Sequence, residues 1–184
     1  MGILAKIRPG SEQGHPNKGG TGQQGCYTRR NMKPTIYIGA DHAGWKLKED
    51  LEEFLKELAY PVVDMGNEHL VADDDYPDFG HAVAKRVVTD PNGMGIVLCG
   101  NAQGICMVAN KVRGSRAATG FNEEVAKTSR NDDHSNVLCL PARFLKPKEA
   151  RNIVRVWLET PFSGEARHVR RLKKLEEIEA HERG

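Results

Sequence analysis

The sequence has no apolar run of the roughly 20 residues that a helix needs to cross a bilayer. It also has no apolar stretch followed by a small-residue cleavage site, so we expect no secretory signal and no membrane partner. Its four cysteines contain no Cys-x-x-Cys pair, which argues against a zinc knuckle or a disulfide framework and favours a reducing compartment. These absences predict a soluble, cytoplasmic protein.

Excess charge is missing from most of the chain. The 184 residues carry a net charge of +2, and residues 1–32 alone hold five basic residues and one acidic residue, a net charge of +4. The rest of the chain therefore carries a net charge of about −2. Without a general basic surface, nucleic acid is not an expected partner, except through a local patch.

Residues 1–32 also differ from the rest in composition. They hold 7 of the 19 glycines and show no apolar periodicity after the first four residues. Such a segment cannot bury enough apolar surface to order itself. We therefore predict a disordered N-terminal extension over residues 1–32 and one folded domain over residues 33–184.

From residue 33 onward, strand-like and helix-like patterns alternate. Short apolar runs predict strands at residues 35–38, 61–64, 94–99, 116–119 and 136–140. Apolar residues spaced by three and four predict helices at residues 45–58, 79–87, 105–110, 123–130 and 147–158. Because parallel strands need crossover connections, this order predicts an α/β fold: a three-layer α/β/α sandwich around a Rossmann-like, parallel, five-stranded sheet.

The last predicted helix, residues 165–181, has a narrow apolar stripe. Its members are Val169, Leu172, Leu175 and Ile178, which lie among arginines and lysines. A stripe this thin packs poorly on its own sheet and better across a partner subunit. We therefore expect the C-terminal helix to take part in dimerisation.

Polar residues follow two of the predicted strands, at the ends where open α/β sheets bind ligands. Asp41 and His42 come after the first strand; they could bond a sugar and exchange a proton, or Asp41 could only cap the next helix. Cys99 ends the third strand, where a helix N-terminus or a nearby cation favours the thiolate. A reactive Cys99 and a buried, inert Cys99 both remain open, whereas Cys106 and Cys139 are expected to be inert.

Three further features allow a functional or a purely structural interpretation. The segment from Gly100 to Gly104 could bind an anion through backbone N–H groups, or it could form only a tight turn. Arg167 and Arg171, four residues apart, suit a phosphate monoester, or they belong to a solvated face. His134 precedes the last strand, in a loop where a histidine is usually solvated.

An acidic turn at residues 73–78 lies between His69 and His81. Carboxylates that follow one another in sequence seldom converge on one ion, and they suit the N-terminus of the next helix. We therefore expect no metal and no other cofactor.

Several motifs occur in the order typical of a known family. They are residues 39–44 (Gly-Ala-Asp-His-Ala-Gly), 75–77 (Asp-Tyr-Pro), 99–100 (Cys-Gly) with Gly104, 109–112 (Ala-Asn-Lys-Val), 114–117 (Gly-Ser-Arg-Ala), 136–138 (Asn-Val-Leu) and 167–171 (Arg-His-Val-Arg-Arg). Over roughly residues 34–180 the chain resembles the type B ribose-5-phosphate isomerase family, which also includes the galactose-6-phosphate isomerase subunits. The resemblance implies a metal-free isomerisation of a phosphosugar in a dimer whose active sites draw residues from both subunits.

Carried over by position, the resemblance assigns roles at the reacting carbons. It implies that Cys99 is the base that moves a proton between C1 and C2 through an enediolate. The loop from Gly100 to Gly104, including Asn101, would stabilise the enediolate oxygens, because donors must be placed where negative charge develops.

The resemblance also implies contacts to the rest of the substrate. Asp41, His42 and Tyr76 would contact the sugar. Arg167 and Arg171 of the neighbouring chain would hold the phosphate.

The loop after the third strand departs from the family pattern. Asn101, Ala102 and Gln103 stand where cysteine-bearing members have threonine, glycine and an apolar residue. An amide can still donate a hydrogen bond to an oxyanion, but the pocket changes in size and polarity.

A second departure affects ring opening. Asp132 stands at the position of the family's ring-opening histidine, and Asp133 follows where asparagine is usual. His134 or His42 could take over this role, or the substrate needs no ring opening, as holds for a four-carbon sugar phosphate.

The expected activity is an aldose-ketose isomerase, an intramolecular oxidoreductase, with ribose 5-phosphate and ribulose 5-phosphate as the default pair. The alternatives are an isomerase of a four- or six-carbon phosphosugar, or a catalytically altered phosphosugar-binding module. The expected assembly is a homodimer or a dimer of dimers with shared active sites.

Overall fold

The computed structural model describes residues 33–182. The strands of this part are β1 (Thr35–Ala40), β2 (Val62–Asp64), β3 (Gly93–Cys99), β4 (Ala117–Thr119) and β5 (Val137–Pro141). The helices are α2 (Trp45–Glu57), α3 (Tyr76–Thr89), α4 (Gln103–Ala109), α5 (Glu123–Asn131), α6 (Pro147–Glu159) and α7 (Ala166–Glu182). The extension predicted over residues 1–32 lies outside the described residues. No helix between residues 33 and 182 is both long and apolar enough to span a bilayer.

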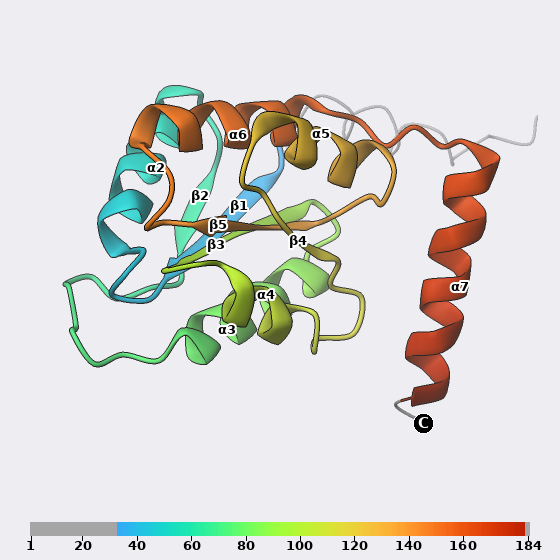
Figure 1. Cartoon of the computed structure of the whole chain (residues 1–184), viewed down its shortest axis with the longest axis horizontal. Helices are drawn as coiled ribbons and strands as arrows, with labels where there is room; N and C mark the ends of the chain where they lie inside the picture. Colours follow the sequence, from blue (N-terminus) through green and yellow to red (C-terminus); the bar gives the residue numbers. More distant parts are fainter. Residues whose placement is uncertain (1–32, 183–184) are drawn as a thin grey trace, which may run out of the picture. The chain divides into compact units, whose positions relative to one another are not determined.

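The five strands form one parallel sheet in the order β2-β1-β3-β5-β4. Figure 1 shows α2, α5 and α6 on one face of this sheet and α3 and α4 on the other. The predicted three-layer sandwich is therefore confirmed. Ala40 of β1 pairs with Leu98 of β3, and Cys99 pairs with Pro141 of β5, so these three strands end at one edge.

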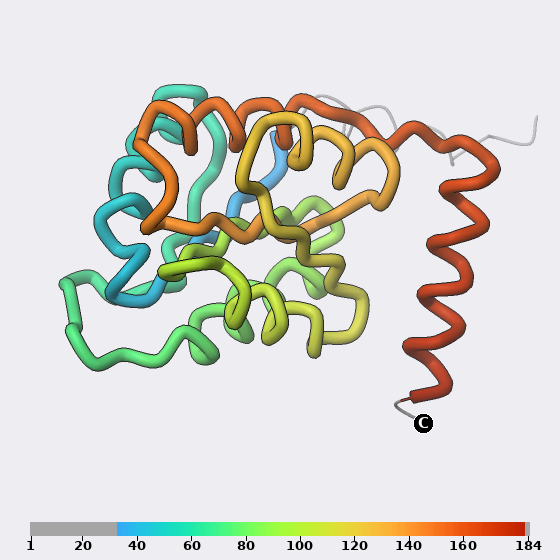
Figure 2. Tube along the Cα trace, viewed as in Figure 1, coloured from blue at the N-terminus to red at the C-terminus, as the bar shows by residue number. Residues whose placement is uncertain are grey.

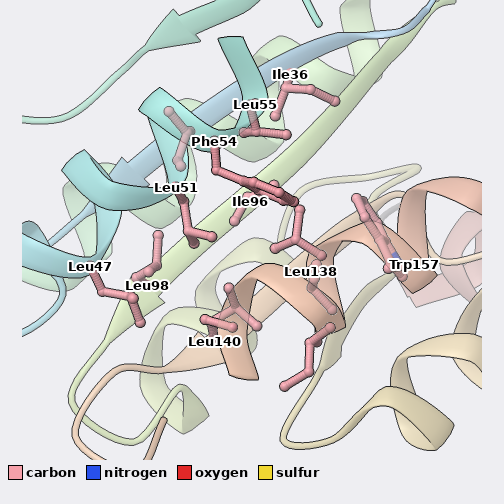
Figure 3. Close-up of a cluster of buried hydrophobic side chains, with 14 of the residues drawn as sticks. Ile36, Leu47, Leu51, Phe54, Leu55, Ile96, Leu98, Leu138, Leu140 and Trp157 are labelled. Atoms are coloured by element: carbon pink, nitrogen blue, oxygen red, sulfur yellow. The ribbon is translucent and has the colours of Figure 1, made fainter. Parts of the chain in front are cut away.

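Alternate residues of each strand face opposite layers, because side chains in a strand alternate with a period of two. On the α2 and α6 side, strand residues Ile36, Ile96, Leu98, Leu138 and Leu140 meet Leu47, Leu51, Phe54 and Leu55 of α2 and Trp157 of α6 (Figure 3). On the other side Tyr37, Val97, Cys99 and Cys139 pack against α3 and α4. A sheet buried on both faces explains why the strands read as continuous apolar runs.

Two helices begin earlier than their apolar spacing predicted. α3 starts at Tyr76, because Pro77 in its first turn has the φ of a helix and needs no N–H partner there. α4 starts at Gln103. As a result, the first turns of α3 and α4, which contain Tyr76 and Gly104, lie at the carboxyl ends of β1 and β3.

The C-terminal helix α7 stands apart from the two helical layers (Figures 1 and 2). Among its described residues His168 is buried, and its Nδ1 lies 2.7 Å from the hydroxyl of Ser163. Near the other end, the carboxylate of Glu179 accepts hydrogen bonds from the N–H of Gly114 at 3.0 and 3.1 Å. Its exposed large apolar residues are Val169, Leu175 and Ile178. The predicted apolar stripe is thus largely uncovered in a single chain.

A buried lysine joins α2 to β2. The side chain of Lys48 is fully buried, and its ammonium bonds Glu49 at 2.8 Å, Glu52 at 3.1 Å, and Asp64. Burial alone would lower the pKa of Lys48, but the hydrogen bonds to these three carboxylates raise it above its ordinary value. The three carboxylates converge as metal ligands would, but the ammonium already bonds each of them. The cluster therefore serves to fix β2 and the connection that follows it.

Replacing Lys48 by methionine removes the buried cation of the cluster, which leaves Asp64 without its counter-charge and Glu52 with only the exposed Lys56, at 3.2 Å. We expect Lys48→Met to lower the free energy of unfolding by about 3 kcal/mol, because breaking a buried ion pair strands a charge. Urea denaturation of the purified protein measures this change. The matched control is Lys46→Met on the exposed face of α2, which should change the free energy by less than about 0.5 kcal/mol. Equal effects of the two substitutions would rule out a stabilising role for the cluster.

Candidate active site

The carboxyl ends of β1 and β3 form the centre of the candidate site. The N–H of Asp41 donates to the carbonyl of Leu98 at 3.3 Å, so the residues that follow β1 lie beside Cys99. From this point the chain passes to α2 on one face of the sheet and to α4 on the other. Such a topological switch point opens the crevice in which open α/β sheets bind ligands.

Asp41 is 6% exposed, and its Oδ1 accepts a hydrogen bond from the N–H of Gly44 at 3.0 Å. Gly44 is the residue before α2, so Asp41 does help to close the turn that starts this helix. Burial raises the pKa of Asp41, and the Gly44 hydrogen bond and the neighbouring His42 oppose that shift. Asp41 thus closes the turn before α2 but is not its N-cap, which is Gly44.

His42 is held by a carboxylate from another loop. Both its backbone N–H and its ring Nδ1 contact Oδ1 of Asp74, at 2.7 and 2.9 Å. The hydrogen bond to Asp74 raises the pKa of His42 above its ordinary value, with a smaller contribution from Asp41. Asp74 lies in the connection between β2 and α3, and no pattern in the sequence indicated that it would reach His42.

Cys99 is the last residue of β3 and is 4% exposed. Its side chain packs in the apolar cluster on the α3 and α4 face, and its backbone lies at the carboxyl end of β3. Cys99 is therefore both a core residue and a residue of the candidate site. Its carbonyl accepts from the N–H of Ala142 at 2.9 Å, and the carbonyl of Gly100 accepts from the N–H of Arg143 at 3.1 Å. The end of β5 is thereby joined to the same edge.

Arg143 is a site residue that the sequence analysis missed. A Cβ added to Gly100 would lie 3.0 Å from Nε and 3.1 Å from Cζ of Arg143, so the guanidinium covers this glycine. The sequence signal for Arg143 was its place two residues after β5, the third strand whose carboxyl end lies beside Cys99. A guanidinium here brings positive charge and several donors to the crevice.

The loop after Cys99 has an unusual backbone. Ala102 has φ +63°, in the left-handed region, and is fully buried. Oδ1 of Asn101 accepts from the N–H of Gln103 at 3.1 Å, which closes the turn before α4. A Cβ on Gly104 would lie 2.6 Å from the ring of Tyr76, so this glycine allows the tyrosine to cover the start of α4. The structure thus brings Tyr76, Asn101 and Gly104 together beside Cys99.

The left-handed conformation of Ala102 predicts a stabilising substitution. Ala102→Gly should raise the free energy of unfolding by about 1 kcal/mol, because an L side chain pays roughly that much at positive φ and glycine does not. Chemical denaturation provides the measurement. The control is Ala82→Gly inside α3, where the same change should lower the free energy by about 1 kcal/mol. A loss of stability at both positions would contradict the assignment of strain to Ala102.

The remaining candidate residues lie away from the carboxyl ends of the strands, and those next to the sheet lie at its amino ends. Asp132, Asp133 and His134 precede β5, whose first residue pairs with Gly95, whereas its last residue pairs with Cys99. The full length of the strand therefore separates these residues from Cys99 of the same chain. Asp132 and Asp133 line a cavity of about 710 Å³ together with Arg171 of α7.

His134 is a neutral, packed histidine in this second group. Its ring stacks on Phe162 with centroids 4.8 Å apart, and its φ is +50°. Burial lowers the pKa of His134 to about 4, and Arg130 and Arg116 add to the effect. The loop histidine that was expected to be solvated is instead half-buried, because the loop folds against Phe162 in the segment that leads to α7.

The neighbours of His134 have partners of their own. Oδ1 of Asp132 accepts from the side chain of Asn131 at 2.6 Å and lies 3.9 Å from Nδ1 of the buried His168. Arg167 is largely exposed and pairs with Glu165 at 2.9 Å. In a single chain these residues do not approach Cys99.

The other two described cysteines lie near one another on the α3 and α4 side. Cys139 is fully buried, and burial raises its pKa well above the ordinary value. A hydrogen bond from Cys139 lowers the pKa of Cys106 to about 7. Cys106 was expected to be inert, and its altered pKa comes from a contact between α4 and β5 that the sequence did not indicate.

Comparison with known proteins decides the family. A family model described as Ribose/Galactose Isomerase matches residues 36–175. The chain belongs to the ribose/galactose isomerase family. The matched segment of this family member includes both groups of candidate residues, from Asp41 to Arg171.

Individual members of the ribose/galactose isomerase family are similar over most of the chain. A probable ribose-5-phosphate isomerase B from Mycoplasma genitalium is 42% identical over 145 residues, which are 78% of this chain and 95% of that protein. Ribose-5-phosphate isomerase B from Mycobacterium tuberculosis is 40% identical over 144 residues, 78% of this chain and 89% of that protein. The crystal structure of the Mycoplasma genitalium enzyme with bound ribulose-5-phosphate has a TM-score of 0.78 and 41% identity, and covers 82% of this chain and 99% of that one.

Proposed function

We propose that this protein is an aldose-ketose isomerase of a small phosphorylated sugar, with ribose 5-phosphate and ribulose 5-phosphate as the default pair. The observation that carries the proposal is the group formed by Asp41, His42 and Cys99 at the switch point of the sheet. A relative 41% identical to this chain binds ribulose-5-phosphate, which supports the same substrate class here. The reducing cytoplasm expected from the cysteine pattern remains a prediction.

Cys99 is the proposed base. In the open-chain aldose its thiolate removes the proton on C2, the electron pair forms the C1–C2 double bond, and the carbonyl oxygen O1 takes up a proton. The hydroxyl on C2 then loses its proton, and Cys99 returns a proton to C1 to give the ketose. Base and acid within reach of adjacent carbons are the requirement for such a transfer.

The negative charge of the enediolate needs fixed donors. Backbone N–H groups of the loop from Gly100 to Gly104, with the amide of Asn101, are the donors proposed for this charge. Arg143, whose guanidinium covers Gly100, adds a cation at the same edge. Tyr76, packed on Gly104, is proposed to contact the sugar and to limit the access of water.

We propose that the second group of residues serves the site of another copy of the chain. Asp132, Asp133 and Arg171 lie at the edge of the sheet opposite their own Cys99, so they cannot complete its site. The exposed stripe of α7 offers a surface for a second copy. A two-fold pair would bring Arg167 and Arg171 of each chain to the phosphate bound by the other.

The residues available for opening the sugar ring favour a second class of substrate. Asp132 stands at the position of the family's ring-opening histidine, and His134 is neutral and stacked on Phe162. A four-carbon sugar phosphate forms no ring through its phosphorylated hydroxyl, so a four-carbon isomerase needs no such group. The assay therefore includes four-, five- and six-carbon phosphosugars.

The first test measures turnover and its dependence on Cys99. Proton exchange at C2 in heavy water and ketose formation are followed for the phosphosugar panel. Cys99→Ala should lower kcat by roughly 10³-fold for the preferred substrate while affinity is retained, because general base catalysis contributes about that much. Cys106→Ala, which removes a thiol outside the crevice, is the control and should retain activity. No turnover by the wild-type protein would favour a phosphosugar-binding module instead.

The second test asks whether sites are shared between chains. Cys99→Ala and Arg171→Ala should each be inactive alone, whereas a mixture refolded at equal ratio should regain about one quarter of the wild-type activity. The recovery arises because each mixed dimer holds one site free of both substitutions. A mixture as inactive as its parents, or a monomer in sedimentation, would show that each chain builds its own site.

A further inference from the structure

We propose that Asp74 is a positioning residue that orients the imidazole of His42, so that Nε2 faces the substrate and can donate to a substrate oxygen. This inference rests on the proposed function and concerns how the same site is set up. Asp74 itself does not touch the substrate in this scheme, and it acts through His42.

The contact between the two residues is specific in geometry. One oxygen of Asp74, Oδ1, meets both the backbone N–H and the ring Nδ1 of His42, at 2.7 and 2.9 Å. Because this oxygen contacts both the backbone and the ring of His42, it fixes the orientation of the imidazole as well as its position. Because Nδ1–H is donated to the carboxylate, Nε2 is the nitrogen left to meet a ligand, as in other histidines held by a carboxylate.

Asp74 is itself held rigidly. Its side chain is 9% exposed, and its other oxygen, Oδ2, accepts from the side chain of Asn67 at 3.0 Å. The carbonyl of Asn67 accepts from the indole N–H of Trp45 at 3.1 Å, so the connection is tied to the first residue of α2. The hydrogen bond from Asn67 therefore opposes rotation of the carboxylate when His42 changes its charge, as an orienting group requires.

Electrostatics supports the same role. The side chain of His42 is 38% exposed, while that of its partner is nearly buried. Asp74 raises the pKa of His42, and Asp41 on its own loop acts in the same direction. At neutral pH a larger fraction of His42 is therefore the imidazolium, which carries a proton on Nε2 as well as on Nδ1, than in a histidine without these carboxylates. A donor of this kind suits O1 of the substrate, where negative charge develops during enolisation.

The alternative is that Asp74 only closes the connection between β2 and α3. That role would change stability and leave the protonation of His42 unimportant for the rate. The two roles differ in their dependence on His42, so a double-mutant cycle separates them.

The experiment compares Asp74→Asn with Asp73→Asn in the full chain. Both substitutions remove one negative charge from the same connection, and Asp73 is exposed. Asp74→Asn should lower kcat/KM by about 10-fold to 100-fold, because loss of an orienting carboxylate costs an amount of that order. It should also move the alkaline limb of the pH profile to lower pH, since His42 would lose its proton more readily. Asp73→Asn should leave both unchanged.

The cycle and a titration complete the test. In a His42→Ala background, Asp74→Asn should have little further effect on kcat/KM. The imidazole resonance of His42, followed by NMR, should titrate at lower pH in Asp74→Asn than in the wild type. An equal loss of activity with and without His42, or an unchanged titration, would overturn the proposal. If the wild type turns over no phosphosugar, the proposed function fails, and the NMR titration still decides whether Asp74 controls His42.

Discussion

The parallel pairing of β1 with β3 is the constraint on which the candidate site depends. Because the two strands run in the same direction in register, their carboxyl ends meet at one edge, and the N–H of Asp41 bonds the carbonyl of Leu98. The turn with His42 therefore lies beside Cys99, although a helix, a strand and a second helix separate them in sequence. The chain then leaves toward opposite faces, which makes this the topological switch point where open α/β sheets bind ligands.

The same strand polarity divides the chemistry of the chain into two groups. Residues that end or follow strands, among them Cys99 and Arg143, gather at the carboxyl ends of the strands, whereas Asp132 and Asp133 precede β5 and lie at the amino ends. No change of side-chain conformation can bridge the length of a strand. A phosphosugar site that uses both groups must therefore be built by two chains, and the uncovered stripe of α7 is consistent with that assembly.

Charged groups far apart in sequence hold the connections around the crevice in place. Lys48 of α2 bonds Asp64 at the end of β2, and Asp74 further along the same connection bonds His42. One partner of each contact, Lys48 and Asp74, is buried or nearly so, and there competition from water is weaker than at an open surface. The β2–α3 connection thereby becomes part of the site, although none of its carboxylates follows the end of β1 or β3.

The sequence by itself determined the order of strands and helices, and with it the residues at strand ends. Apolar runs and spacings of three and four depend on local geometry, so the parallel sheet and the positions of Asp41 and Cys99 were predictable. The starts of α3 and α4 were predicted late, because their first residues are set by proline, glycine and strand ends and not by apolar spacing.

Only the tertiary structure decided which distant groups meet. The hold of Asp74 on His42, the guanidinium of Arg143 over Gly100 and the neutral, stacked ring of His134 arise from contacts between separate elements. A pKa and a side-chain direction depend on burial and on partners in space, and a single sequence carries no periodic signal for either.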